Sequence, residues 1–560
     1  MSSTPHRAGV VPRERARRLI AAVGCATVMC VAATAAQADS WHHGDHGNRG
    51  AELIPGNLLL STSQYTPADI TPGVTQLPPG CTASNCVTAI ADGAYPFVFN
   101  NNTIDGSFGV TSRVFLDRLT PWGQVIDRIA VPSRDLVTSF SSKSELALNL
   151  STNGHDVTFM GYRAPVAALD VSNSNTPGVI DPSNPVTGTN YRVVADLGRD
   201  GRFDSFTLTN AYSGNNGRAA ILNNAANVIY SAGNAGNGGN PQPDGIIVGA
   251  GAQILTPSFE SGWPQAVQTP GPPTPVGSFN ITQLGDKPDK IGKDTNFRGL
   301  TISNNVVYYT KGSGGNGVNT VYFVDTTGKA CPNGVGLPQP GAQLPTSPIA
   351  YDPAVLQTKG VFPYNMCILQ GFPTALKSTT SFPFGLWFAN ANTLYVADEG
   401  NGSNTFSTAT GTYTDAAAQT TAGLQKWVFN QAADAGAGAW QLAYTLQSGL
   451  NLGQPYTVPG YPTVNNAVTG LPWSPATDGL RNLTGHVNRD GTATIWAITS
   501  TVSGSGDQGA DPNKLVAITD TLAATTLPAG ESFVTLRTAN VGEALRGISF
   551  TPGTGLDQEP

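Results

Sequence analysis

The chain has 560 residues, of which 39% are hydrophobic and only 12% are charged, and its formal net charge is −7. This hydrophobic content can supply a large core and excludes wholesale disorder. The mild acidity argues against nucleic acid or an anionic membrane as the main partner. Glycine (65 residues) and proline (41) are abundant, and short Val, Ile, Tyr and Phe runs alternate with Asn, Gly and Ser turns. This composition is typical of an all-β protein with many loops.

The first 38 residues have the features of a signal peptide. Arg17 and Arg18 end a basic segment, residues 19–36 are mostly apolar, and Ala36-Gln37-Ala38 is a small-residue cleavage site. Cleavage before Asp39 removes five arginines and one glutamate, which changes the formal charge from −7 to −11. No later stretch reaches about 18 uninterrupted apolar residues, so we expect no membrane span and a soluble protein exported to the periplasm or the medium.

Residues 39–56 are predicted to form a flexible leader. The leader contains His42, His43 and His46, which are three histidines within five residues. Imidazole is a ligand for copper, nickel and zinc, so these residues are metal-ligand candidates. Flexible histidine-rich tails also bind such ions without any function, and the sequence does not choose between the two readings.

A strand–turn–strand pattern recurs along the chain. In its clearest copy, residues 297–309, the apolar strand Phe-Arg-Gly-Leu-Thr-Ile is followed by a turn at 303–305 and by a second apolar strand. Two short apolar runs on either side of an Asn-rich turn predict a β-hairpin. Hairpins of the same kind begin near Glu145, Arg218, Phe384 and Arg481, and a half-copy, Leu545–Phe550, stands near the C-terminus.

Three strands near the N-terminus lack an opening strand of this kind. They are Asn57–Ser61, Arg113–Leu119 and Val125–Val131. Leu545–Phe550 supplies the missing strand, so we predict that both termini share one sheet, which removes the sheet edges of a circular array. The other copies continue into a second hairpin, and four strands per unit in a circular array make a β-propeller.

We therefore predict an all-β fold, a single β-propeller of six four-stranded blades over residues 57–552, with residues 553–560 as a tail. Seven blades is the alternative, if a degenerate copy lies within residues 250–290. A β-sandwich would not explain both the repeat and the terminal unit that is split between the two ends of the chain.

The recurring Leu/Phe-Arg-Gly-Leu/Ile openers resemble those of secreted bacterial β-propellers, and the resemblance covers most of the mature chain. It concerns architecture and implies no activity. The sequence lacks the evenly repeated Trp motifs of quinone-dependent propeller dehydrogenases. It also lacks the histidine-centred chemistry of propeller enzymes that cleave lactones.

Two of the six cysteines leave with the signal peptide, and Cys81, Cys86, Cys331 and Cys367 remain. Four cysteines permit three pairings. In an oxidising compartment we predict the local pairing, 81 with 86 and 331 with 367. The alternative is four free buried thiols.

The first strand of each propeller blade lines the central channel, so the residue at its start is informative. These positions hold Glu145, Arg218, Arg298, Phe384, Arg481 and Arg546. Four guanidiniums at one mouth of the channel could bind a carboxylate, sulfate or phosphate group of a ligand. The alternative is structural, because Asp294, Asp478 and Glu543 lie just upstream and could pair with the arginines to join neighbouring blades.

The loops on the arginine face are rich in glycine, asparagine and serine, as in 398–402 and 503–507. They could contact a ligand or hold Ca²⁺, and no other cofactor is predicted. Residues Asp196–Asp204 resemble a calcium loop, but Thr207 stands where the loop needs its last acidic ligand. A hairpin turn is the simpler interpretation of that segment.

The sequence contains no nucleophile elbow, no phosphate-binding loop and no metalloprotease motif. His155 and His486 fall at turns on the face opposite to the arginines, which argues against a histidine-based site at the arginine mouth. The remaining candidates for acid/base chemistry there are the carboxylates of Glu145, Asp398 and Glu399.

Together these features predict an exported binding or scaffold protein, with its site at the loop-rich face and the axial channel. The expected partner is a small anionic or carbohydrate ligand, or an extracellular protein. The alternative is a hydrolase or lyase that acts on a small anionic or carbohydrate substrate through carboxylate acid/base chemistry.

Overall fold

The structure is a computed structural model that describes residues 52–91, 93–101, 109–173, 184–186, 188–209, 211–212, 215–234, 251–257, 296–312, 318–331, 333–346, 366–376 and 380–555. The predicted signal peptide and the leader histidines His42, His43 and His46 lie outside these residues, as do most of residues 250–290. Arg49–Pro560 forms one compact unit. No helix in the described ranges is long and apolar enough to cross a bilayer.

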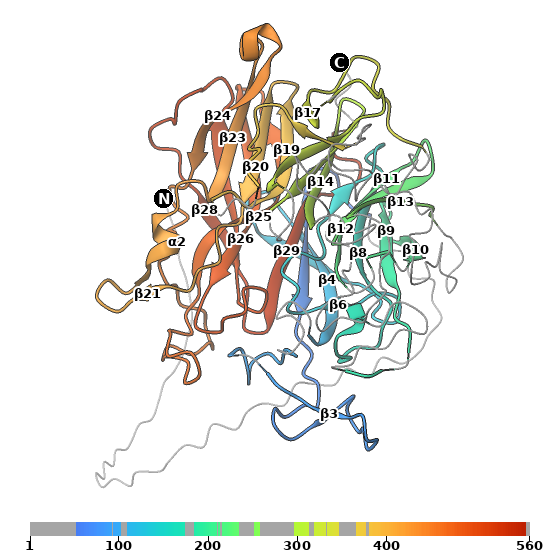
Figure 1. Ribbon diagram of the computed structural model, residues 1–560, viewed down its shortest axis with the longest axis vertical. Coiled ribbons are helices and arrows are strands. Elements are labelled where there is room, and N and C mark those ends of the chain that lie inside the picture. The colour runs from blue at the N-terminus through green and yellow to red at the C-terminus, as the bar shows by residue number, and fades with distance from the viewer. Residues whose placement is uncertain are drawn as a thin grey trace, which may run out of the picture. The chain divides into compact units, whose positions relative to one another are not determined.

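Six β-sheets, called blades 1 to 6 here, contain most of the secondary structure (Figure 1). Blade 1 is built from both ends of the chain, and blades 2 and 3 follow it in sequence. Blade 1 contains β29 (Glu543–Phe550), β1 (Leu58–Gln64), β4 (Thr111–Leu119) and β5 (Val125–Ala130), with β6 (Thr138–Ser139) beside β4. Blade 2 contains β7 (Asn149–Leu150), β8 (Asp156–Tyr162), β9 (Arg192–Gly198) and β10 (Phe203–Thr209). Blade 3 contains β11 (Gly217–Asn223), β12 (Val228–Gly233) and β13 (Ala252–Leu255).

The C-terminal half of the chain forms the other three blades. Blade 4 contains β14 (Phe297–Ser303), β15 (Val306–Lys311), β16 (Thr320–Val324), β18 (Met366–Leu369) and β17 (Val335–Gly336), of which the last two are parallel. Blade 5 contains β19 (Pro383–Asn390), β20 (Thr393–Asp398), β23 (Gly423–Asn430) and β24 (Ala439–Leu446). Blade 6 contains β25 (Ala476–Val487), β26 (Thr492–Val502), β27 (Lys514–Thr521) and β28 (Val534–Thr538).

Among the described residues, the elements outside the blades are short. They are the hairpins β2 (Gln76–Leu77) with β3 (Val87–Thr88) and β21 (Phe406–Ser407) with β22 (Thr412–Tyr413), the helix α2 (Thr414–Ala418), and the 3₁₀ turns η1 (Val171–Asn173) and η2 (Asp434–Gly436).

The innermost strands of the six blades form a closed ring. Around the axis, β7 contacts β11, followed by β14, β19, β25 and β29, and β29 contacts β7 again. The predicted six-bladed β-propeller is therefore confirmed. Because β11 and β14 touch one another directly, no further blade stands between them, and the seven-blade alternative is wrong.

The two ends of the chain close the ring within blade 1. β1 pairs with β29 on one side, with Leu58 opposite Phe550 and Leu60 opposite Ile548, and with β4 on the other side. In Figure 1 the red β29 lies beside the blue N-terminal strands. The predicted pairing of Leu545–Phe550 with the first strand is confirmed. A strand with neighbours on both sides leaves no open edge at this point.

Two details of the blades differ from the expectation. Blade 3 has three described strands, and blades 1 and 4 have five each, where four were predicted for each blade. The innermost strand of blade 2 was expected to begin at Glu145, but only Asn149 and Leu150 pair with β8. Leu146 has a φ of 64°, a left-handed conformation that is incompatible with a continuous strand. The chain from Glu145 to Leu148 therefore does not join the sheet.

The core lies between neighbouring blades. Side chains of blades 3 and 4, such as Tyr230 and Tyr309, share one apolar cluster, and blades 5 and 6 share another that includes Leu424 and Ile495. Each blade packs against a neighbour on both faces, so the central strands have mainly apolar sequences. The fully buried β15 is an example. This explains why the openers repeat: each one fills the same position in the ring.

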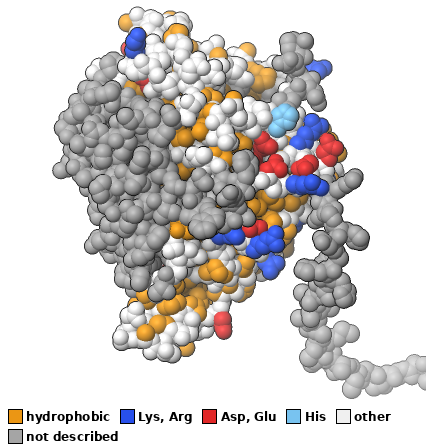
Figure 2. Space-filling model, turned by 90° about the vertical axis from the view of Figure 1, so that its right-hand side faces the viewer, with side chains coloured by type: hydrophobic (Ala, Val, Ile, Leu, Met, Phe, Trp, Pro, Cys, Tyr) orange, Lys and Arg blue, Asp and Glu red, His pale blue; other side chains and the backbone are white. Residues whose placement is uncertain are grey.

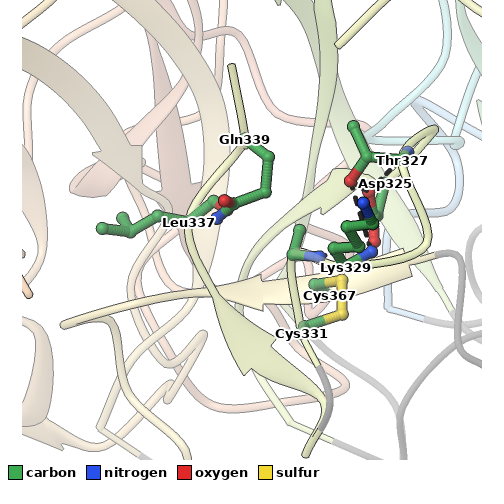
Figure 3. Close-up of a disulfide and its surroundings, with 8 residues drawn as sticks. Asp325, Thr327, Lys329, Cys331, Leu337, Gln339 and Cys367 are labelled. Atoms are coloured by element: carbon green, nitrogen blue, oxygen red, sulfur yellow. Dashed lines mark hydrogen bonds between the residues drawn. A yellow bond between two sulfur atoms is a disulfide. The ribbon is translucent and has the colours of Figure 1, made fainter. Parts of the chain in front are cut away.

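Both predicted disulfides are present. Cys81 pairs with Cys86, and Cys331 pairs with Cys367 on β18. Figure 3 shows the second disulfide next to Asp325, whose carboxylate accepts hydrogen bonds from the Thr327 hydroxyl (2.7 Å) and the Ala330 backbone N–H (2.9 Å). Asp325 and the two sulfurs lie close together, but the carboxylate is engaged by its own turn and the sulfurs by each other. This group therefore serves as a structural staple and not as a metal site.

Candidate functional site

A cavity of about 750 Å³ opens on the propeller axis. Every blade lines it with the C-terminal part of its innermost strand or the turn that follows. The contributing segments are 148–152, 221, 301–305, 386–387, 483–486 and 548–550, together with Leu344, Thr554 and Gly555. Because the arginine positions lie at or nearer the other end of these same strands, the cavity is at the opposite end of the channel from the arginines.

Apart from His486 and the indole of Trp387, the polar side chains that line this axial cavity are amides and hydroxyls. Asn304 and Asn305 form the β14–β15 turn, where both adopt left-handed backbone conformations with φ of 49° and 59°. Asparagine tolerates this conformation, which explains its presence in the turn. Thr484 and Ser549 add hydroxyl groups from β25 and β29. His486 is the single titratable side chain among the described residues that line the cavity.

Trp387 is the one indole among the described residues that line the axial cavity. Its ring stacks on Tyr395, with 5.8 Å between ring centroids and 22° between ring planes. On β25, a Cβ added at Gly485 would come within 2.5 Å of the Trp387 ring. Glycine at this position therefore lets the ring lie directly against the neighbouring blade. Trp387 is held between two blades, which gives a ligand a fixed aromatic surface.

His486 connects the axial cavity with a second one. Its ring lies 6.2 Å from that of Phe550, and both residues also line a cavity of about 620 Å³ between blades 6 and 1. Trp122, which is 78% exposed, and Trp496 are further walls of this second cavity. Since Thr554 and Gly555 also belong to both linings, the two cavities form one continuous surface.

At the arginine end, Glu399 is the centre of a buried charge cluster. Its carboxylate lies 3.4 Å from Lys143 Nζ, 3.3 Å from Arg481 Nε and 3.7 Å from Arg298 Nη2. Burial opposes ionisation of Glu399, but the charges of Lys143, Arg298 and Arg481 outweigh it and lower the pKa of Glu399 to about 2. One carboxylate thus joins three cations from the loop before blade 2 and from blades 4 and 6.

The other two arginines bind mainly backbone carbonyl groups. Arg218 on β11 donates to the carbonyl of Phe297 in blade 4 (2.7 Å) and to the side chain of Asn296. Arg546 on β29 donates to the carbonyl of Gly509 (2.9 Å) and to that of Phe140. All four arginines therefore contact a neighbouring blade or an inter-blade loop.

The acidic partners predicted for the arginines are not the ones that the fold uses. Asp478 accepts hydrogen bonds from the Gly402 N–H (2.8 Å) and the Gln419 amide (2.6 Å). Glu543 pairs with Arg128 (3.2 Å) and Arg537 (3.7 Å). Asp294 lies outside the described residues. The missed partner, Glu399, directly follows β20 and was singled out in the sequence only as a catalytic candidate.

The other candidate carboxylates are engaged by hydrogen bonds. Glu145 accepts from the Thr138 hydroxyl (2.7 Å), the Ser139 N–H (3.1 Å) and the Asn216 amide (3.1 Å), and also from Tyr162.

Asp398 accepts from the backbone N–H groups of Phe382 (2.8 Å) and Gly400 (3.0 Å). Burial raises the pKa of Asp398 to about 7. Of the three carboxylates, none lines the axial cavity. The loop 398–402, considered for Ca²⁺, uses this acidic group to fix its own backbone.

Comparison with known proteins yields only distant likenesses. No family model matches the chain, and no curated protein matches it. Among solved structures, the periplasmic gluconolactonase of Pseudomonas aeruginosa is 11% identical with a TM-score of 0.34, covering 88% of this chain and 98% of that one. The PQQ-bound aldose sugar dehydrogenase of Streptomyces coelicolor is 11% identical with a TM-score of 0.30, covering 75% and 95%. An ulvan lyase of polysaccharide lyase family PL25 is 12% identical with a TM-score of 0.28, covering 84% and 96%. Scores of this size carry no argument about substrate or reaction.

Proposed function

We propose that the protein is an exported binding protein that holds a neutral carbohydrate, of one to a few sugar units, in the axial cavity. The observation that carries this proposal is the lining of that cavity, in which amides, hydroxyls and one indole stand among apolar side chains. Its volume of about 750 Å³ falls within the range of about 300–1,000 Å³ typical of small-molecule sites.

The chemistry of the lining matches that of a sugar. Amide and hydroxyl side chains such as Asn304, Asn305 and Thr484 both donate and accept hydrogen bonds, as sugar hydroxyls do. The apolar C–H face of a pyranose ring can pack on the indole of Trp387. Apart from His486, the described residues that line the cavity include no acidic or basic side chain of the kind that an anionic ligand or acid/base catalysis would require. Binding is therefore favoured over the hydrolase or lyase alternative.

Filling the cavity tests this proposal. We expect calorimetry with a panel of neutral mono-, di- and trisaccharides to find at least one that binds the parent protein. Thr484→Trp, which places an indole in the cavity, should weaken that binding by about tenfold or more, equivalent to about 1.4 kcal/mol. Thr535→Trp on the outermost strand of the same blade, where residue 535 is exposed, is the matched control.

Two results would contradict the proposal. One is the absence of binding by every neutral saccharide in the panel, and the other is equal affinity in the parent and in Thr484→Trp. NMR spectra of the sugar after incubation with the protein separate binding from turnover, because a new anomeric signal would support the hydrolase or lyase alternative instead.

A second candidate, binding of a small anion by the arginine cluster, is favoured by the contacts of Arg218. This side chain is 3% exposed, and its Nε has no hydrogen-bond partner among the described residues. Burial and the nearby charge of Arg298 lower the pKa of Arg218 well below its usual value. A bound carboxylate, sulfate or phosphate would stabilise this guanidinium.

The test of anion binding is thermal. We expect sulfate or citrate to raise the Tm of the parent protein above its value in sodium chloride of equal ionic strength. Arg218→Met should remove this increase, and Arg134→Ala, whose side chain is 87% exposed, should keep it. A parent protein whose Tm does not respond to sulfate or citrate would show that the arginines only join the blades.

A further inference from the structure

Three aspartates gather on blade 2. Asp156, Asp196 and Asp204 come from the neighbouring strands β8, β9 and β10, and one carboxylate oxygen of each lies within 4.8 Å of the others. The register of β9 and β10 shifts between Phe203 and Ser205, and Asp204 stands at this irregularity. Two of the three residues belong to the 196–204 segment, whose hairpin interpretation is borne out, whereas Asp156 comes from 40 residues earlier in the chain.

The central carboxylate of this aspartate cluster, that of Asp196, is buried and incompletely hydrogen-bonded. Asp196 is only 8% exposed, and its Oδ1 has no hydrogen-bond partner among the described residues. Among those residues, no lysine or arginine forms an ion pair with Asp156, Asp196 or Asp204, and the nearby Arg202 instead lies 3.7 Å from Asp200. Burial, together with the charges of Asp156 and Asp204, raises the pKa of Asp196 to about 7. A buried carboxylate beside two others is costly unless a cation offsets the charge.

The surroundings of these carboxylates hold them in place. Asp156 Oδ2 accepts hydrogen bonds from the Asn224 amide (2.8 Å) and the Ser151 hydroxyl (3.2 Å), which orient its other oxygen. A Cβ at Gly198 would lie 2.5 Å from Asp204 Oδ2 and 3.4 Å from Asp200 Oδ1. Glycine at 198 therefore makes the space in which the acidic groups approach one another.

The cluster is open to solvent at one edge. Asp204 is exposed, so an ion has access to the carboxylates from the surface of the blade. Figure 2 looks onto the side of the molecule where β9 and β10 lie in Figure 1, and acidic side chains gather there next to basic ones and a histidine.

We propose that Asp156, Asp196 and Asp204 bind one Ca²⁺ ion. Calcium is a hard cation that takes carboxylate and water oxygens at about 2.3–2.6 Å, so two of its ligands lie at most about 5 Å apart. The carboxylate spacing meets this limit. The cluster contains no histidine or cysteine, so its donor set does not suit zinc or copper. Calcium is preferred over Mg²⁺ because it accepts irregular ligand geometry and gives up water more readily. The bound ion would fix the β9–β10 hairpin to β8.

Calorimetric titration of the full mature chain with CaCl₂, after treatment with a chelator, tests this site. We expect one ion per chain with a Kd of about 10⁻⁴ M or tighter, in the range of extracellular calcium sites. Saturating Ca²⁺ should raise the Tm, since a ligand that binds only the folded state stabilises it. Asp196→Asn should weaken Ca²⁺ binding by about tenfold or more and remove the Tm increase.

The control is Asp415→Asn, because Asp415 is a hydrogen-bonded aspartate next to the β21–β22 hairpin, remote from blade 2 in the chain. This variant should bind Ca²⁺ as the parent does. If Asp196→Asn does not fold, Asp204→Asn provides the same test with an exposed residue. Unchanged binding in the cluster variants, no Ca²⁺ binding by the parent, or Mg²⁺ binding as tight as that of Ca²⁺ would each overturn the assignment.

Discussion

Ending the chain at Ala539 should leave a protein that does not fold. This truncation removes β29, all eight of whose residues are buried, and with it the inner neighbour of β1. Burial of Leu545, Ile548 and Phe550 alone contributes about 1.5–3 kcal/mol per side chain. Their sum approaches the entire stability of a typical domain, about 5–15 kcal/mol, and the ring also opens on both sides of the gap.

The measurement is the near-ultraviolet circular dichroism and the soluble yield of the truncated protein. A chain that ends after Gly555 is the control, because it keeps β29 and the hydrogen bond between the Gly56 N–H and the Thr554 hydroxyl (2.8 Å). If the chain that ends at Ala539 had the same spectrum and Tm as this control, closure by the C-terminal strand would not be what holds the propeller together.

Replacement of Glu399 by glutamine should destabilise the protein by about 3–5 kcal/mol, the usual cost of breaking a buried ion pair by removing one partner. Glu399 is 4% exposed and offsets the charges of Lys143, Arg298 and Arg481. The glutamine keeps the size of the side chain and removes only its charge. Urea unfolding at pH 7 measures the loss, and Glu52→Gln, at a residue whose side chain is 71% exposed, is the control.

The pH dependence of stability gives a second readout at Glu399. The pKa of this group in the folded protein, about 2, lies below the value of about 4.3 in an unfolded chain. Its stabilising contribution is therefore complete above about pH 4.3 and is lost as the pH falls toward 2. The stability difference between the parent and Glu399→Gln should shrink over this interval. A difference that stays constant from pH 7 to pH 3 would contradict the assigned role.

The architecture could be predicted from the sequence because its signals are local. The openers around Arg298 and Arg481 recur with similar residues, since each fills an equivalent place in the ring. The orphan Leu545–Phe550 and the three unaccompanied strands at the N-terminus together implied the closure. The cysteine pairing followed from spacing and compartment.

The site could not be predicted in the same way, because it depends on contacts between distant residues. Glu399 and Lys143 are far apart in the sequence and form an ion pair only in the folded protein. The cavity lining was present in the sequence as Asn304, Asn305 and Thr484, but uncharged polar residues near turns look like ordinary turn chemistry. Asp156 meets Asp196 only because two strands lie side by side. The functional prediction was based on the charged residues at the arginine end. The open cavity lies at the other end of the channel.

The pairing of β1 with β29 also determines when the protein can finish folding during its synthesis. Leu58 leaves the ribosome about 490 residues before Phe550, which corresponds to roughly 25–100 s of synthesis. Throughout this time β1 lacks its inner partner, and an unpaired strand edge can recruit other chains. The propeller can therefore close only after this last strand has been synthesised. Completion of the fold therefore requires the chain up to Phe550.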